Sequence, residues 1–82
     1  MPRVILGSET DDALFARLAQ VVAELGGTMT DREWVLGGSQ EITRYTIALP
    51  SGSVEATAET YVGLSLSGNE ALVREIESRI RA

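Results

Sequence analysis

The chain has 82 residues and a net charge of −5, and a chain of this length forms one domain whose core is just large enough without disulfides or metals. It contains neither cysteine nor histidine, so thiolate chemistry, the commonest general base and the commonest transition-metal ligand are all missing. The acidity argues against nucleic acid and anionic membranes as partners, because both require a positively charged surface.

Residues 3–6 form a short run that is apolar after Arg3 and rich in branched side chains, which predicts a short strand. Ser8, with Asp11 three positions later, is expected to cap the helix that follows. Apolar residues at helical spacing then predict an amphipathic helix; they are Leu14, Leu18, Val21 and Leu25, with Phe15 and Val22 beside them. We expect this helix to end at Gly26 and Gly27, because glycine adopts the left-handed cap conformation without a steric penalty.

Residues 28–36 and 41–49 predict the two arms of a β-hairpin, with its loop at 37–40. In a regular strand Met29 and Trp34 lie on opposite faces of the first arm, and either face could be the buried one. Trp34 therefore either closes the core or is exposed as an anchor for a partner. The high average burial of large aromatic residues favours the core.

The strongest pattern covers residues 53–67, where apolar residues occupy the even positions from Val54 to Leu66 and Thr60 is the one interruption. A period of two is typical of a strand with one face on the core and the other toward water. We expect one long strand here, bent at Gly63.

The last segment predicts a second helix that begins with a capping box, in which Ser67 is the cap and Glu70 lies three residues on. Glu70 with Arg74, and Glu75 with Arg79, have the spacing and orientation that favour ion pairs on a helix. The apolar face of this helix consists of Leu72, Val73, Ile76 and Ile80.

The predicted element order is β-α-β-β-β-α. Two helices with apolar stripes and a sheet with one apolar face most simply form a two-layer α+β sandwich. In this arrangement an antiparallel meander sheet carries both helices on one face, and its other face is open. No linker or repeat interrupts the pattern, so we expect residues 1–82 to form a single globular domain.

The open face is the expected partner-binding surface, and its candidate residues are Arg44, Glu55, Thr57, Glu59 and Tyr61, with Trp34 if that side chain points outward. Glu55 and Glu59 would be about 13 Å apart along a strand, which is too far for two carboxylates that share a proton or act as a glycosidase pair. No spacing of acidic residues matches a metal-binding loop. We therefore predict no catalytic residue, no metal and no cofactor.

The favoured function is a non-catalytic module that binds a protein partner, or a second copy of itself, through the open sheet face or an edge strand. The alternative is an acidic inhibitor or immunity-type protein that blocks a basic site. A small-ligand-binding protein or an enzyme ranks last, because a core of this size uses most of the apolar side chains. The chain has neither a run of roughly 20 apolar residues nor a signal peptide, which predicts a cytoplasmic location and no contact with membrane.

Overall fold

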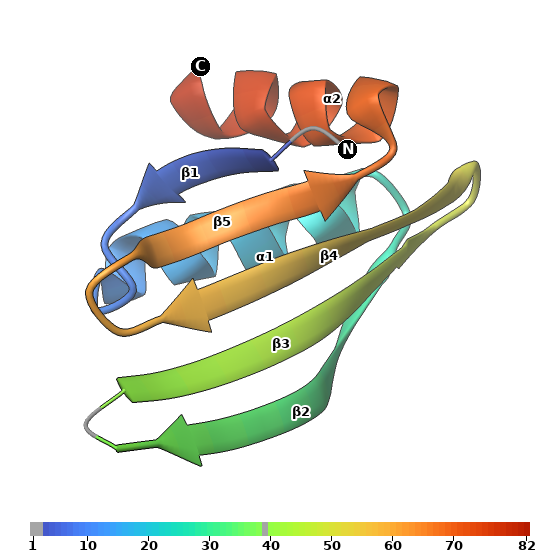
Figure 1. Cartoon of the computed structure of the whole chain (residues 1–82). Coiled ribbons are helices and arrows are strands. Elements are labelled where there is room, and N and C mark those ends of the chain that lie inside the picture. Colours follow the sequence, from blue (N-terminus) through green and yellow to red (C-terminus); the bar gives the residue numbers. More distant parts are fainter. Residues whose placement is uncertain (1–2, 39) are drawn as a thin grey trace.

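The computed structural model describes residues 3–38 and 40–82, and of residues 31–33 and 35–37 it describes the backbone alone. In these residues the elements are β1 (Arg3–Gly7), α1 (Asp12–Glu24), β2 (Thr28–Gly37), β3 (Gln40–Leu49), β4 (Gly52–Glu59), β5 (Gly63–Gly68) and α2 (Glu70–Arg81). The strands form one sheet in the order β1-β5-β4-β3-β2, and every neighbouring pair is antiparallel (Figure 1).

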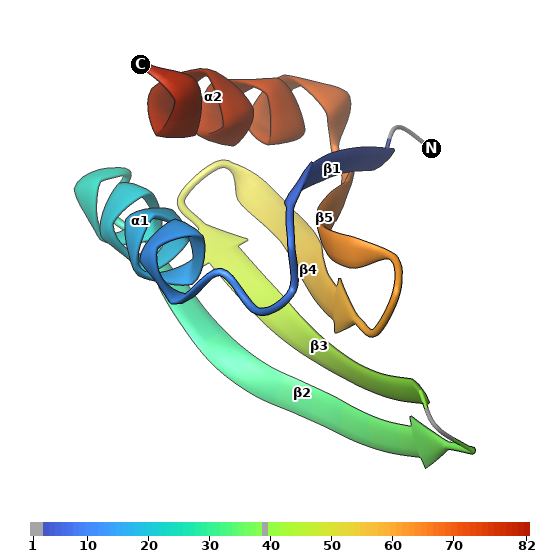
Figure 2. The ribbon, with the colours of Figure 1, turned by 90° about the vertical axis from the view of Figure 1, so that its left-hand side faces the viewer.

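Both helices lie on the same side of this sheet (Figure 2), as predicted for a two-layer α+β sandwich. α1 packs against β2 and α2, while α2 packs against β1, β4 and β5. The core lies between the layers and consists of Leu6, Leu18, Val21, Val22, Ile47, Val54, Ala56, Leu64, Leu66, Val73 and Ile76. The predicted apolar faces of both helices supply this core, and within the described residues no helix lies on the opposite sheet face.

The predicted long strand over 53–67 is wrong, because the chain reverses within it and forms β4 and β5. The pairs across this hairpin are Ala58 with Leu64 and Ala56 with Leu66. Inward residues therefore occupy even positions in both arms, and the apolar pattern resumes in the same phase after the turn, where Thr60 is its one interruption. The observed order is β-α-β-β-β-β-α, with one strand more than predicted.

The turn at Thr60–Val62 has no glycine or asparagine at the position that favours them. Val62 N–H donates to the Glu59 carbonyl oxygen at 3.0 Å, and Tyr61 adopts a positive φ of 70°. This conformation is uncommon for a residue with a side chain. Gly63 follows with φ 118°. The glycine that usually signals a hairpin turn thus lies after this turn, at position 63, instead of within it.

The cap of α1 is Asp11 rather than the predicted Ser8. Leu14 N–H donates to Asp11 Oδ1 at 3.0 Å, while the Ser8 hydroxyl accepts from Thr10 N–H at 3.2 Å in the preceding turn. A carboxylate at this position also interacts favourably with the positive end of the helix dipole.

The predicted end of α1 is confirmed. Gly26 adopts φ 78°, and its N–H donates to the Ala23 carbonyl oxygen at 3.0 Å. Gly27 N–H donates to the Val22 carbonyl oxygen at 2.9 Å. This pair of bonds is a Schellman motif, which satisfies carbonyl groups at the helix end.

The cap of α2 is Asn69, two residues after the predicted Ser67. Asn69 Oδ1 accepts from Leu72 N–H at 3.2 Å, whereas Ser67 still belongs to β5. The predicted ion pairs are present, with N–O distances of 3.2 Å between Arg74 and Glu70 and 3.5 Å between Arg79 and Glu75.

The β2–β3 hairpin has the predicted arms, and Ser39 of its predicted loop lies outside the described residues. The register shifts between Asp31 and Glu33, as in a β-bulge. Met29 pairs with Ile47 and Trp34 pairs with Thr43, so both lie on the helix-facing side although one is odd and the other even. Because of the bulge, odd positions lie on the helix-facing side before it and even positions lie there after it, so neither parity holds for the whole strand.

Replacement of Gly63 by alanine should destabilise the fold more than the same change at Gly38. Both glycines have positive φ, but a Cβ on Gly63 would collide with the Gly7 carbonyl oxygen, whereas none of the described atoms lies within 4 Å of a Cβ on Gly38. We expect Gly63→Ala to lower the unfolding free energy by about 2–4 kcal/mol and Gly38→Ala by about 1 kcal/mol. Urea denaturation followed by circular dichroism measures both, and equal losses would contradict the close β1–β5 approach.

Asn69→Ala should lower the unfolding free energy by about 1 kcal/mol, because the N–H of Leu72 loses its side-chain acceptor. Ser67→Ala should change it by less than about 0.5 kcal/mol. Thermal or urea denaturation of the two variants distinguishes the observed cap from the predicted one. The reverse order of effects would show that Ser67 begins the helix.

Candidate functional site

Four of the six predicted site residues share the open face of the sheet. Arg44 on β3 pairs with Thr57 on β4, and Glu55 and Glu59 lie two positions to either side of Thr57. Residues that pair across antiparallel strands, or that are two apart along a strand, point to the same side. These four residues therefore lie on one face of the sheet, and their role in binding stays a prediction.

Glu59 is held in place by residues from other strands. Its Oε1 lies 3.8 Å from Arg3 Nη2 on β1, and its Oε2 accepts from Gln40 Nε2 at 3.0 Å. Arg3 Nε also donates to Ser65 Oγ at 3.4 Å. Because Arg3 is half-exposed, this ion pair contributes at most about 1 kcal/mol of stability. Its main effect is to fix the polar side chains at this part of the open face.

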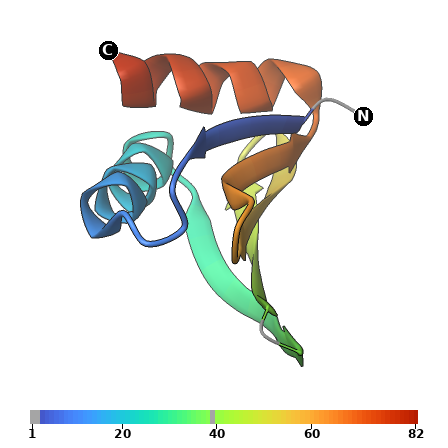
Figure 3. The ribbon, with the colours of Figure 1, turned by 60° about the vertical axis from the view of Figure 1, so that its left-hand side comes forward.

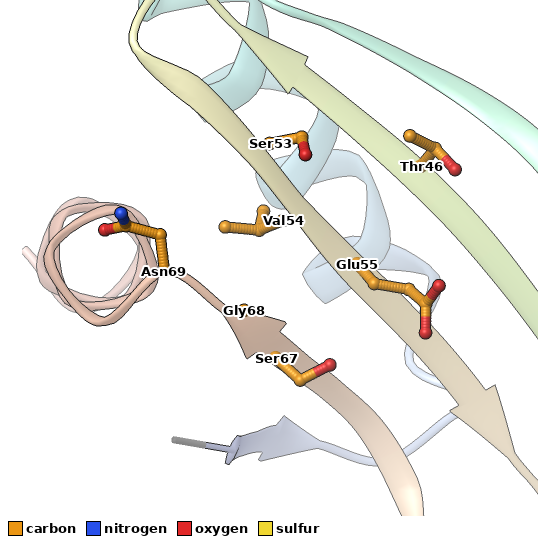
Figure 4. A pocket seen from close by; sticks show the side chains of 7 residues that line it. All are labelled: Thr46, Ser53, Val54, Glu55, Ser67, Gly68 and Asn69. Carbon is orange, nitrogen blue, oxygen red and sulfur yellow. The ribbon is translucent and has the colours of Figure 1, made fainter. Parts of the chain in front are cut away.

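A hollow of about 370 Å³ lies on the open face near the start of α2 (Figure 4). The described residues that line it are Thr46, Ser53, Val54, Glu55, Ser67, Gly68 and Asn69. Glu55 is the only ionisable side chain among them, and the Asn69 amide oxygen is already used as the cap of α2. The hollow thus brings hydroxyls and one carboxylate together, without a second acid or base for proton transfer.

Tyr61 and Trp34 do not lie on the open face. Tyr61 is in the β4–β5 turn, where 82% of it is exposed, and its N–H donates to Glu9 Oε2 at 3.4 Å. Trp34 is 60% exposed but pairs with Thr43, on the helix-facing side of the hairpin. The expectation that Trp34 belongs to the core is wrong, since neither helix covers this part of β2.

The exposed large apolar side chains of the described residues all lie toward one end of the sheet. We call this end of the sheet the turn end; its exposed apolar residues are Ile5 in β1, Trp34 in β2, and Tyr61 and Val62 in the β4–β5 turn, which are 53%, 60%, 82% and 37% exposed. Figure 1 shows that the end of β1, the β4–β5 turn and the end of β2 lie at the same end of the molecule. The pairing agrees, because Trp34, Thr43, Ala58, Leu64 and Gly7 form one row across the strands.

Two members of the turn end were not predicted. Ile5 lies in the predicted first strand, which is an edge strand, and it pairs with Ser65 on the open face. Val62 occupies an inward position of the predicted long strand, but it lies in the turn. Finding Val62 would have required recognition of the turn, and finding Ile5 would have required the order of the strands.

A groove of about 390 Å³ lies at the same end on the helix-facing side of the sheet. We call it the end groove; its described lining residues are Glu9, Thr10, Glu41, Thr43, Tyr45, Ala58 and Thr60. Its floor is continuous with the core through Tyr45, whose ring centroid is 5.2 Å from that of Phe15 on α1. Two carboxylates line it, and none of the described lining residues is cationic.

No three acidic side chains among the described residues are grouped in a way that could hold a metal ion. Every buried side-chain nitrogen or oxygen in this part of the chain has a hydrogen-bond partner. Within the described residues, no helix combines the length and the apolar character needed to cross a membrane.

The comparisons with known proteins assign no family to the chain. No family model matches it, and neither a curated protein nor a solved structure does.

Proposed function

We propose that this chain is a non-catalytic protein-interaction module that contacts its partner through the turn end. The observation that carries this proposal is Tyr61, an almost fully exposed aromatic residue held at φ 70°. Glycine at this position would satisfy the same turn with less strain. The tyrosine side chain therefore contributes little to the fold, which favours a role outside it.

A left-handed backbone conformation costs a residue with a side chain about 1–2 kcal/mol, and such strain is concentrated at functional positions. Tyrosine is also one of the residues that most often dominate the energetics of protein interfaces. In the turn end it lies beside Val62 and near Ile5, whose Cγ2 is 3.4 Å from the place of a Cβ on Gly63. Together these residues offer an apolar centre for an interface.

The open face next to the turn end supplies a polar rim. Glu59 is fixed there by Arg3 and Gln40, and Thr57 and Arg44 continue the polar surface across the strands. An apolar centre with a polar, solvent-accessible rim is the usual anatomy of a protein interface. The predicted open-face residues would thus form the border of the interface, and the turn end its centre.

Three lines of evidence favour binding over catalysis. The carboxylates of the open face are four residues apart on one strand, the hollow there holds one ionisable group among its described residues, and Glu59 is engaged by two neighbours. The alternative, an acidic inhibitor of a basic site, also stays a prediction. It ranks lower because the acidic residues are distributed along the whole chain and are not concentrated in one segment of the sequence.

Tyr61→Gly tests the proposal because it should separate binding from folding. Removal of the ring should weaken partner binding by about 2 kcal/mol, while the unfolding free energy should stay unchanged or rise by up to about 1 kcal/mol. Stability is measured by urea denaturation. Binding is measured by affinity capture from a lysate of the source organism, with the bound proteins quantified by mass spectrometry. Tyr61→Phe is the matched control, since it keeps the ring and the turn.

A protein that is captured by the wild type and Tyr61→Phe, but not by Tyr61→Gly, would support the proposal. A protein retained equally by all three would place the interface elsewhere. An empty capture with a monomeric sedimentation profile would refute the module function itself.

A further inference from the structure

We infer that the end groove receives an arginine side chain from a segment of the partner protein. This inference rests on the proposed function and specifies the chemistry of its partner. The groove and Tyr61 belong to one continuous surface, because Glu9 lines the groove and accepts the N–H of Tyr61 at 3.4 Å. Thr60, the residue before Tyr61, lines the groove as well. A partner seated on Tyr61 would therefore reach the groove.

The groove exists because the hairpin is longer than the helix that packs on it. β2 and β3 have 10 residues each, which corresponds to about 33 Å, whereas the 13 residues of α1 span about 20 Å. Figure 3 shows the hairpin extending beyond both helices and the β1–α1 connection. The helix-facing side of its outer half is left uncovered, and the volume of about 390 Å³ is in the range of ligand-binding pockets.

The charges of the groove favour a cation. Glu9 lies on one side of it, in the β1–α1 connection, and Glu41 lies on the other, in β3. Thr10, Thr43 and Thr60 also line the groove. The Thr60 hydroxyl is bonded to the Glu41 backbone and the Thr10 hydroxyl to Ser8, so the two carboxylates are the groove's principal acceptors for a cation. No described lining residue carries a positive charge, and the whole chain has a net charge of −5. A positively charged side chain would complement this arrangement.

Trp34 favours arginine over other cations. It is directly opposite Thr43, which lines the groove, and cross-strand neighbours of this kind have Cβ atoms about 5 Å apart. Its indole is 60% exposed and lies on the same side of the sheet as the groove. A guanidinium group stacks on aromatic faces and forms bidentate pairs with carboxylates, whereas an ammonium group does so less well.

The partner segment must therefore carry an arginine that passes over the outer half of the hairpin. Its guanidinium would lie between the Glu9 and Glu41 carboxylates, with Trp34 as a stacking surface. The chain contains one tryptophan, so its NMR spectrum has a single indole N–H signal that reports directly on this surface.

The test uses a short blocked peptide with a central arginine between valine and threonine residues, and the same peptide with citrulline in place of arginine. Citrulline has the same shape but no charge. In a titration at up to millimolar concentration, we expect the arginine peptide to shift the Trp34 indole signal and the amide signals of Thr43 and Thr60 saturably. The citrulline peptide should bind about tenfold more weakly, because it loses charge-assisted hydrogen bonds.

Two variants with the same change of charge give the second readout. Glu41→Gln removes a carboxylate from the groove, whereas Glu24→Gln removes one at the far end of α1. We expect Glu41→Gln to weaken binding of the arginine peptide about tenfold and Glu24→Gln to leave it unchanged. Equal affinities for the two peptides, equal effects of the two variants, or the absence of shifts at Trp34 would each overturn the inference.

The two proposals fail in different ways. If the arginine peptide does not bind while Tyr61→Gly still abolishes capture of a partner, the inference is overturned and the module function stands. If the arginine peptide binds with the expected discrimination but capture does not depend on Tyr61, the groove is supported and the proposed role of the turn end is refuted.

Discussion

Burial of the inner face of β4 and β5 is the constraint on which the rest of the structure depends. Ala56 and Leu66 face each other across these central strands and are fully buried, and the neighbouring inward residues Val54 and Leu64 are nearly so. At 82 residues the chain can form only one such core. α2 closes this core against β1, β4 and β5, and α1 closes it through β2 and α2. Segments that do not contribute to this core can extend beyond the two packed layers.

The outer half of the β2–β3 hairpin is such a segment. Its strands continue beyond the length that α1 can cover, so their helix-facing side meets solvent instead of a helix. In a larger protein such a surface would be closed by a further element. In this chain it stays open and becomes one wall of the end groove. The groove and the exposure of Trp34 are thus two consequences of the same mismatch in length.

The sequence predicts well those features that follow from side-chain periodicity. Both helices, the hairpin arms and the two-layer α+β arrangement are set by where apolar residues recur, and all are confirmed. The Schellman end of α1 is also predictable, because only glycine fits Gly26 without strain. Neighbouring polar side chains that can each cap the same helix are harder to rank, and both observed caps, Asp11 and Asn69, lie later in the chain than predicted.

Features that depend on the pairing between strands could not be predicted from the sequence. The even positions of β4 pair with even positions of β5, so the alternation keeps its phase across the reversal, and Thr60 in the turn is the one polar residue that interrupts it. The turn itself carries Tyr61 where glycine or asparagine would have signalled it. For the candidate site, alternation predicts the shared face of Glu55, Thr57 and Glu59, but it leaves the face of Arg44 open and does not predict the separate positions of Tyr61 and Trp34.

The bulge in β2 links the fold to the proposed binding surface. With regular pairing, Trp34 would lie on the same side as Arg44 and join the polar open face. The register shift between Asp31 and Glu33 moves it to the side of Thr43 and the end groove. Bulges are frequent at sheet edges, where they also hinder unwanted strand pairing by increasing the local twist. One irregularity in an edge strand thus both places the exposed Trp34 on the side of the sheet that carries the end groove and makes the edge of β2 a poorer template for aggregation. This favours recognition through side chains at the end of the sheet over recognition by addition of a strand to β2.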